Sequence, residues 1–231
     1  SFEREARARG LCDYASALRM LYPNESRCEE RAEDLYREAV SLLHGGQLGV
    51  TRALVLLNLA TLLNERRCGA TWQHQERALE AIQRAFDSLD GRPEDKLGAH
   101  ERQLRAALFL ARGNIIRSRA FGDESSLKEE ALSSYHSGLN SLDDGDGTEL
   151  RGLLRHALGV LHSDFASSRS DLEIGVRNLD AAVADFSDNP IPRARALVAR
   201  APIQSLLQRQ SEAHADIRAA RAAFLAQGDI H

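Results

Sequence analysis

The stretch ALEAIQRAFDSL, residues 78–89, decides the fold class of this 231-residue chain. Small residues occupy its first and eighth positions, and large apolar residues occupy its fifth, ninth and twelfth positions. On an α-helix these positions lie along one stripe. The small residues allow a neighbouring helix to approach closely, and the large residues fill the groove beside them. The stretch therefore predicts a helix that packs against other helices.

The same stripe recurs along the chain. The copies are Ala32-Tyr36-Ala39-Val40-Leu43, Ala78-Ile82-Ala85-Phe86-Leu89, Ala131-Tyr135-Gly138-Leu139-Leu142, Gly175-Leu179-Ala182-Val183-Phe186 and Ala213-Ile217-Ala220-Arg221-Phe224. Only the last copy departs from the pattern, with Arg221 in place of a large apolar residue. The copies begin 46, 53, 44 and 38 residues apart. We interpret this as a constant packing unit joined by loops of varying length.

Another helix is expected before each copy. A small residue stands 18 positions before three of the copies, at Ala60, Gly113 and Ala157. Turns rich in glycine, proline and aspartate separate about ten helical segments. Because a single helix pair of this kind cannot bury its apolar face, neighbouring pairs must stack. We predict one all-α domain over residues 1–231, an α-solenoid of about five antiparallel helix pairs at 2–45, 48–90, 96–142, 147–187 and 191–227.

Composition and charge argue against two classes of partner. The longest apolar run, Ala53 to Leu63, has 11 residues and is interrupted by Asn58, whereas a membrane-spanning helix needs about 20. The net charge is −4 and charges of both signs are mixed along the chain, with no basic arm or stripe. We therefore expect neither a membrane nor a nucleic acid as a partner.

The cysteines indicate the compartment. Cys12, Cys28 and Cys68 are odd in number and widely spaced, without a C-x-x-C pair. We expect free thiols and a cytoplasmic location. The chain begins at Ser1 and ends soon after a glycine that could cap a helix, so we also expect a piece of a longer protein or a trimmed domain.

Known metal and catalytic motifs are missing from the sequence. There is no H-E-x-x-H motif, phosphate-binding loop or nucleophile elbow. His156 and His162 are six residues apart, which places them on different helix faces. Three aspartates form one acidic turn: Asp143, Asp144 and Asp146. Arg155 occupies the position where a calcium loop starting at Asp144 would need a glutamate, so this turn is predicted to cap the next helix. We expect no metal, no cofactor and no catalytic residue.

The small-large-small arrangement resembles the tetratricopeptide repeat (TPR). The matching positions are Ala32-Tyr36-Ala39, Ala78-Ile82-Ala85 and Ala131-Tyr135-Gly138. The family's usual period is 34 residues, and here it is longer and irregular. Residues 111–138 and 158–183 are similar to the long-period repeats of bacterial CHAT-protease-associated and STAND-type proteins. The resemblance implies a right-handed solenoid, a bacterial source and a repeat array that senses or holds a partner for a separate effector domain.

The expected function is non-catalytic binding of a protein or peptide, as a scaffold or sensor. In stacked helix pairs the first helices line a concave groove, where asparagine can pair with a peptide backbone and arginine can clamp a carboxylate. The candidate groove residues are Asn64, Asn114, Arg117, Arg151 and His162.

Two alternatives remain open. The array could be an oligomerisation spine, although Arg221 favours a polar cap on the last helix over end-to-end stacking. An all-α enzyme would instead show a closed apolar pocket with converging titratable groups.

Overall fold

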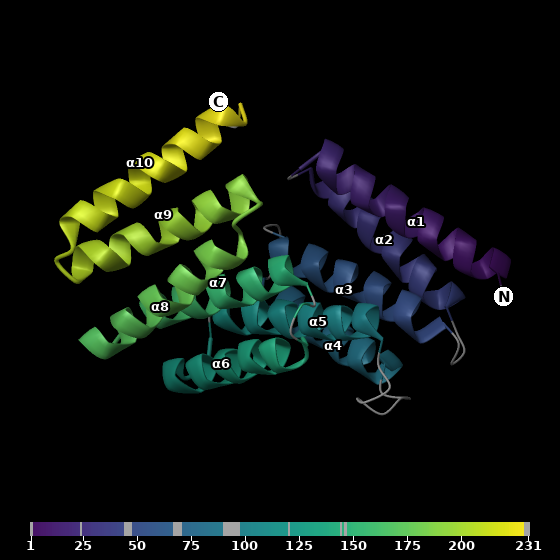
Figure 1. Ribbon diagram of the computed structural model, residues 1–231. Coiled ribbons are helices and arrows are strands. Elements are labelled where there is room, and N and C mark those ends of the chain that lie inside the picture. The colour runs from purple at the N-terminus through teal and green to yellow at the C-terminus, as the bar shows by residue number, and fades with distance from the viewer. Residues whose placement is uncertain are drawn as a thin grey trace. The chain divides into compact units, whose positions relative to one another are not determined.

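A computed structural model describes residues 2–23, 25–43, 48–66, 71–89, 98–119, 121–143, 145 and 147–228. Within these ranges the chain forms ten α-helices and no strand, which confirms the all-α prediction (Figure 1). The helices are α1(Phe2–Leu21), α2(Ser26–Leu42), α3(Gly49–Glu65), α4(Thr71–Leu89), α5(Ala99–Arg117), α6(Glu124–Asn140), α7(Thr148–Asp164), α8(Arg169–Asp185), α9(Pro190–Leu206) and α10(Gln210–Ala226). None of these helices combines the length and the hydropathy needed to cross a bilayer.

The chain divides into two compact units. The N-terminal unit, residues 1–122, contains α1 to α5, and the C-terminal unit, residues 123–231, contains α6 to α10. The predicted third pair, 96–142, is split between the units, because α5 belongs to the first and α6 to the second. The single domain expected over residues 1–231 stays a prediction.

In the N-terminal unit α3 is the central helix. Its apolar residues lie all around the helix, and eight of its residues are buried between α1, α2, α4 and α5. Tyr36 of α2, Leu56 of α3 and Ile82 of α4 are almost completely inaccessible to solvent. The rings of Phe86 and Phe109 join α4 to α5, with centroids 4.7 Å apart. Burial of each such side chain stabilises the fold by about 1.5–3 kcal/mol.

In the C-terminal unit α7 and α8 approach closely at glycines. A Cβ atom on Gly159 would lie only 2.5 Å from Cγ of Leu179, and one on Gly152 only 2.7 Å from the ring of Phe186. Helix α9 packs on both of its neighbours. Ile203 clusters with Leu179 of α8, and Leu197, on another side of α9, clusters with Ala220 of α10.

The repeated stripe explains the core of α2, α4, α6 and α8, where its residues are buried or half-buried. Helix α10 differs, because Ile217 is 53% exposed and Asp216 is buried in its place. The carboxylate of Asp216 accepts two hydrogen bonds from Arg200 of α9, at 2.6 and 2.8 Å. This ion pair fixes the rotation of α10 and turns Ile217 away from α9.

Candidate functional site

The odd-numbered helices of the N-terminal unit form the candidate site. Helix α3 buries one side and leaves a second stripe accessible, as expected for its 3.6-residue period. That stripe consists of Leu54, Leu57, Asn58, Thr61, Asn64 and Glu65. Helix α1 flanks one side of this stripe and α5 flanks the other, with a hollow along each boundary. We call this surface, with the α1 and α5 residues that line its hollows, the odd-helix face.

The hollow between α3 and α5 has a volume of about 270 Å³. Its apolar lining comes from Leu57, Ala107, Leu110, Ala111 and Ile115, and its polar lining from Asn58, Thr61, Asn64, Glu65 and Asn114. Three carboxamides therefore lie among aliphatic side chains, where each can donate and accept hydrogen bonds.

Neighbouring groups orient two of these carboxamides. Asn58 donates from Nδ2 to Sγ of Cys12 at 3.3 Å. The amide oxygen of Asn64 accepts from the Ser118 hydroxyl at 3.2 Å, and the backbone oxygen of Ser118 is held by Gln75 at 2.8 Å. The Nδ2 group of Asn64 then has no partner within the described ranges and is available to a ligand.

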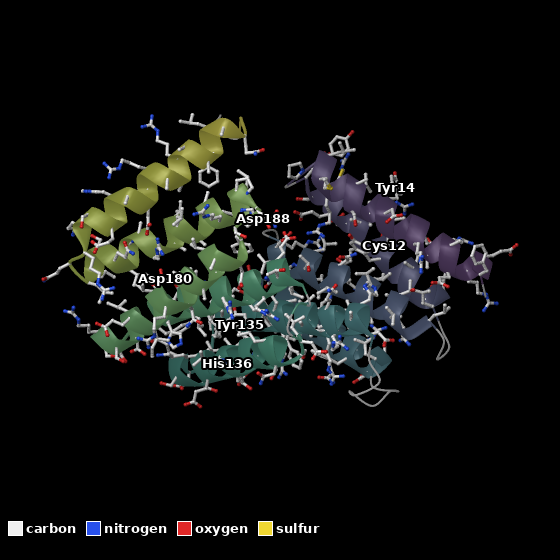
Figure 2. The ribbon with its side chains drawn as sticks, in the orientation of Figure 1. Cys12, Tyr14, Tyr135, His136, Asp180 and Asp188 are labelled. Carbon is white, nitrogen blue, oxygen red and sulfur yellow. The ribbon has the colours of Figure 1, made fainter. Side chains whose placement is uncertain are left out.

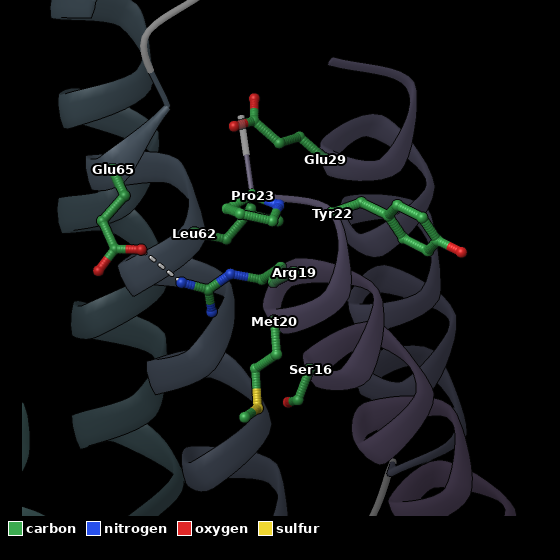
Figure 3. A pocket seen from close by; sticks show the side chains of 8 residues that line it. All are labelled: Ser16, Arg19, Met20, Tyr22, Pro23, Glu29, Leu62 and Glu65. Carbon is green, nitrogen blue, oxygen red and sulfur yellow. Dashed lines mark hydrogen bonds and ion pairs between the residues drawn. The ribbon is translucent and has the colours of Figure 1, made fainter. Parts of the chain in front are cut away.

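Two hollows lie between α1 and α3. One, of about 370 Å³, is bordered by Arg19 and Glu65, whose ion pair of 2.5 Å joins the two helices (Figure 3). Figure 3 also shows Met20 and Ser16 on the α1 side of this space. The other hollow, of about 310 Å³, includes Cys12. Burial raises the pKa of the Cys12 thiol, so this group is protonated at neutral pH and is a poor nucleophile.

The structure brings together two of the five predicted site residues, Asn64 and Asn114, on the α3–α5 hollow. Arg117 is half-buried in the last turn of α5 in the same unit. Arg151 and His162 belong to α7 in the C-terminal unit. Arg151 donates to the backbone oxygen of Asp143 at 2.6 Å, which ties it to the turn before its own helix.

His162 is a buried residue, with 9% of its surface exposed. Its Nδ1 atom lies 4.0 Å from the carboxylate of Asp171 on α8, and Nζ of Lys128 on α6 lies 3.4 Å from the same carboxylate. Burial lowers the pKa of His162, and the charge of Lys128 lowers it further. The imidazole is therefore neutral at pH 7 and packs between helices.

A fourth hollow was not predicted from the sequence. It has a volume of about 410 Å³ and lies between the start of α4 and the residues after α5. Trp72 and Phe121 line it and are 53% and 75% exposed, beside an ion pair of Arg119 with Glu76.

Asn58 of the odd-helix face was also not among the predicted site residues, although a polar residue inside the longest apolar run was a signal for it.

No group of three or more histidine, cysteine, aspartate or glutamate residues is placed to hold a metal ion in the described part of the chain. Cys68, Asp144 and Asp146 lie outside the described residues, so the expectations for the third thiol and for most of the acidic turn are not addressed by the structure.

Comparison with known proteins gives a likeness in fold. No protein-family model matches the chain, and no curated protein is detectably similar to it in sequence. The chain is similar to the crystal structure of BtubC (BKLC) from P. vanneervenii, with a TM-score of 0.65 over 99% of this chain and 93% of that one. The sequence identity is 15%, so the likeness concerns the fold alone.

Proposed function

We propose that this chain is a TPR-like repeat module that binds an extended protein or peptide segment along the odd-helix face, without catalysing a reaction. The observation that carries the proposal is the α3–α5 hollow, where Asn58, Asn64 and Asn114 stand among leucine and alanine side chains. The repeated stripe, the regular helix lengths and the fold likeness to BtubC support a helical repeat.

The spacing of the carboxamides suits an extended backbone. Asn58 and Asn64 are six residues apart on α3 and lie at opposite edges of its accessible stripe, yet both line the same hollow. Their axial separation is about 9 Å at 1.5 Å per residue. An extended chain covers about the same distance in three residues, at roughly 3.3 Å each. Each carboxamide could therefore pair with a different peptide group of one extended segment, because it offers both a donor and an acceptor.

The charges of the odd-helix face favour a segment without strong net charge. Arg19 pairs with Glu65 at 2.5 Å, and Arg9 pairs with Glu5 at 2.6 Å. These pairs neutralise the arginines nearest the hollows, and the aliphatic lining favours apolar side chains. In a longer bacterial protein of the cytoplasm, such a module would act as a scaffold or sensor for an attached effector domain.

A steric block tests this proposal. A displayed library of random peptides is selected on the wild-type chain and then on Thr61→Trp, which places a large ring in the α3–α5 hollow. We expect a consensus peptide on the wild type and at least a tenfold lower recovery on the variant. Gln83→Trp, at an exposed position of α4, is the matched control and should keep full recovery. Equal recovery on Thr61→Trp with unchanged helix content would refute the site.

A further inference from the structure

The hollow of Figure 3, between α1 and α3, carries two carboxylates from different helices. Glu29 lies in the first turn of α2 and Glu65 in the last turn of α3, and both line this space of about 370 Å³. Among the described residues of its lining, the one cation is Arg19. Arg19 donates from Nη2 to Oε2 of Glu65 at 2.5 Å, so these two charges balance each other. The charge of Glu29 is left over.

The other neighbour of Glu29 balances that charge only in part. Nε of Arg66 lies 3.9 Å from Oε2 of Glu29, which is beyond hydrogen-bond distance, and Oε2 is buried without a hydrogen-bond partner in the described ranges. Arg66 instead donates from Nη1 to Glu33 at 2.8 Å and from Nη2 to Glu30 at 3.5 Å. Because three glutamates share this arginine, a second cation in the hollow would find an incompletely paired carboxylate.

Apolar side chains form the rest of the wall beside this carboxylate. Leu62 is buried at the base of α3, whereas Met20 and Tyr22 are 82% and 50% exposed along the rim. Lysine and arginine lay their aliphatic stems along apolar surface and hold the charged end in a polar environment. An apolar wall that ends at a carboxylate is therefore complementary to a basic side chain.

The hollow is continuous with the surface that carries the proposed function. Glu65 lines both this hollow and the α3–α5 hollow, and its neighbour in sequence, Asn64, is one of the three carboxamides of the α3–α5 hollow. A segment that pairs with Asn64 thus comes to the border of the hollow that contains Glu29, within reach of a long side chain.

We propose that the segment bound along the odd-helix face places one lysine or arginine side chain in the hollow of Figure 3. Its charged end pairs with Glu29, and its stem lies against Leu62 and Met20. This inference rests on the proposed function, because it assigns one residue of the bound segment. A single basic residue keeps the net charge of the segment small, in agreement with the ion pairs that neutralise the rest of the face.

The peptides selected on the wild-type chain give the first test. We expect their consensus to contain one basic position at an end of the apolar residues. In a calorimetric titration, Glu29→Gln should raise the dissociation constant at least fivefold, because hydrogen bonds to a charged group are stronger than neutral ones. Glu30→Gln is the matched control. It removes the same charge from the next residue, which also pairs with Arg66 but is 64% exposed and outside the hollow, so it should leave the constant within twofold.

A change in the peptide completes the test. Replacement of its basic residue by methionine should weaken binding to the wild type at least fivefold, but binding to Glu29→Gln less than twofold. Equal loss on Glu29→Gln and Glu30→Gln, or no loss on Glu29→Gln with unchanged helix content, would overturn this inference. A consensus that is lost on Thr61→Trp but has no basic position would also overturn it and leave the proposed function standing. If the wild type enriched no peptide, both would fail.

Discussion

The carbonyl oxygen of Gly175 lies 3.0 Å from the point where a Cβ atom would stand on Gly159. Helices α7 and α8 therefore cross without room for a methyl group, and Leu179 closes the other side of the same space. The small residue that stands 18 positions before the α8 stripe is Ala157, but the close approach is two residues later.

We expect Gly159→Ala to lower the free energy of unfolding by about 1–2 kcal/mol. Overpacking costs about 1–3 kcal/mol, and the better helix propensity of alanine offsets up to about 1 kcal/mol of it. Gly10→Ala is the control, because a Cβ atom there would meet nothing within 4 Å, and it should be neutral or stabilising. Urea denaturation followed by circular dichroism measures both changes. Equal effects of the two variants would contradict the packing of α7 on α8.

Arg200 links three helices of the C-terminal unit, through Asp216 on α10 and Asp180 on α8. The side chain of Asp216 is 7% exposed and that of Arg200 is 17% exposed. Loss of one partner of a buried pair destabilises a protein by about 3–5 kcal/mol. We expect about 3 kcal/mol for Asp216→Ala, since Arg200 keeps its contact with Asp180 (labelled in Figure 2).

The control for this pair is the exposed ion pair of Arg169 and Glu173, whose side chains are 69% and 39% exposed. Glu173→Ala should change the free energy of unfolding by less than about 0.5 kcal/mol. If Asp216→Ala were equally mild in the same denaturation experiment, the Asp216–Arg200 pair would not hold α10 in place.

His162 makes stability depend on pH. Burial holds its pKa in the folded chain below the ordinary value of 6.5, so below that pH the unfolded chain binds more protons. The free energy of unfolding should therefore fall as the pH decreases from about 6.5. Asp171 also has a lowered pKa, because of hydrogen bonds from Ser168 and Ser167, but its contribution is lost only at a much lower pH, below about 4.

His162→Gln should flatten this dependence between pH 7 and pH 5, while His214→Gln, on the exposed side of α10, should leave it unchanged. Chemical denaturation at several pH values measures the slope. A wild-type slope in His162→Gln would show that another group is responsible.

The helices could be predicted because every second one carries the same apolar stripe and because glycine, proline and aspartate mark most of the turns. Nine of the ten helices in the described ranges fall within the predicted pair boundaries, and α9 begins one residue earlier, at Pro190. The orientation of α10 could not be predicted, because it depends on the pairing of Asp216 with an arginine 16 residues earlier. No local sequence pattern predicts the pairing of Asp216 with Arg200.

The candidate site was predictable in part. Asn64 and Asn114 both line the α3–α5 hollow. Each stands at an accessible position on the first helix of its pair, and the repeat register identifies such positions. His162 also lies on a first helix, but in its last turn and on the side that faces α6 and α8. A register uncertain by a few residues cannot separate these faces, since a shift of one residue rotates a side chain by about 100°.

The most direct test of the central claim is a calorimetric titration of the peptide selected on the wild type into the double variant Asn64→Ala, Asn114→Ala. If an extended segment binds across the α3–α5 hollow, the dissociation constant should rise by about 5- to 150-fold, because the two lost hydrogen bonds are together worth about 1–3 kcal/mol. Gln83→Ala, which truncates an exposed carboxamide on α4, should leave the constant unchanged. Wild-type affinity in a fully helical double variant would contradict the account and place the binding surface elsewhere.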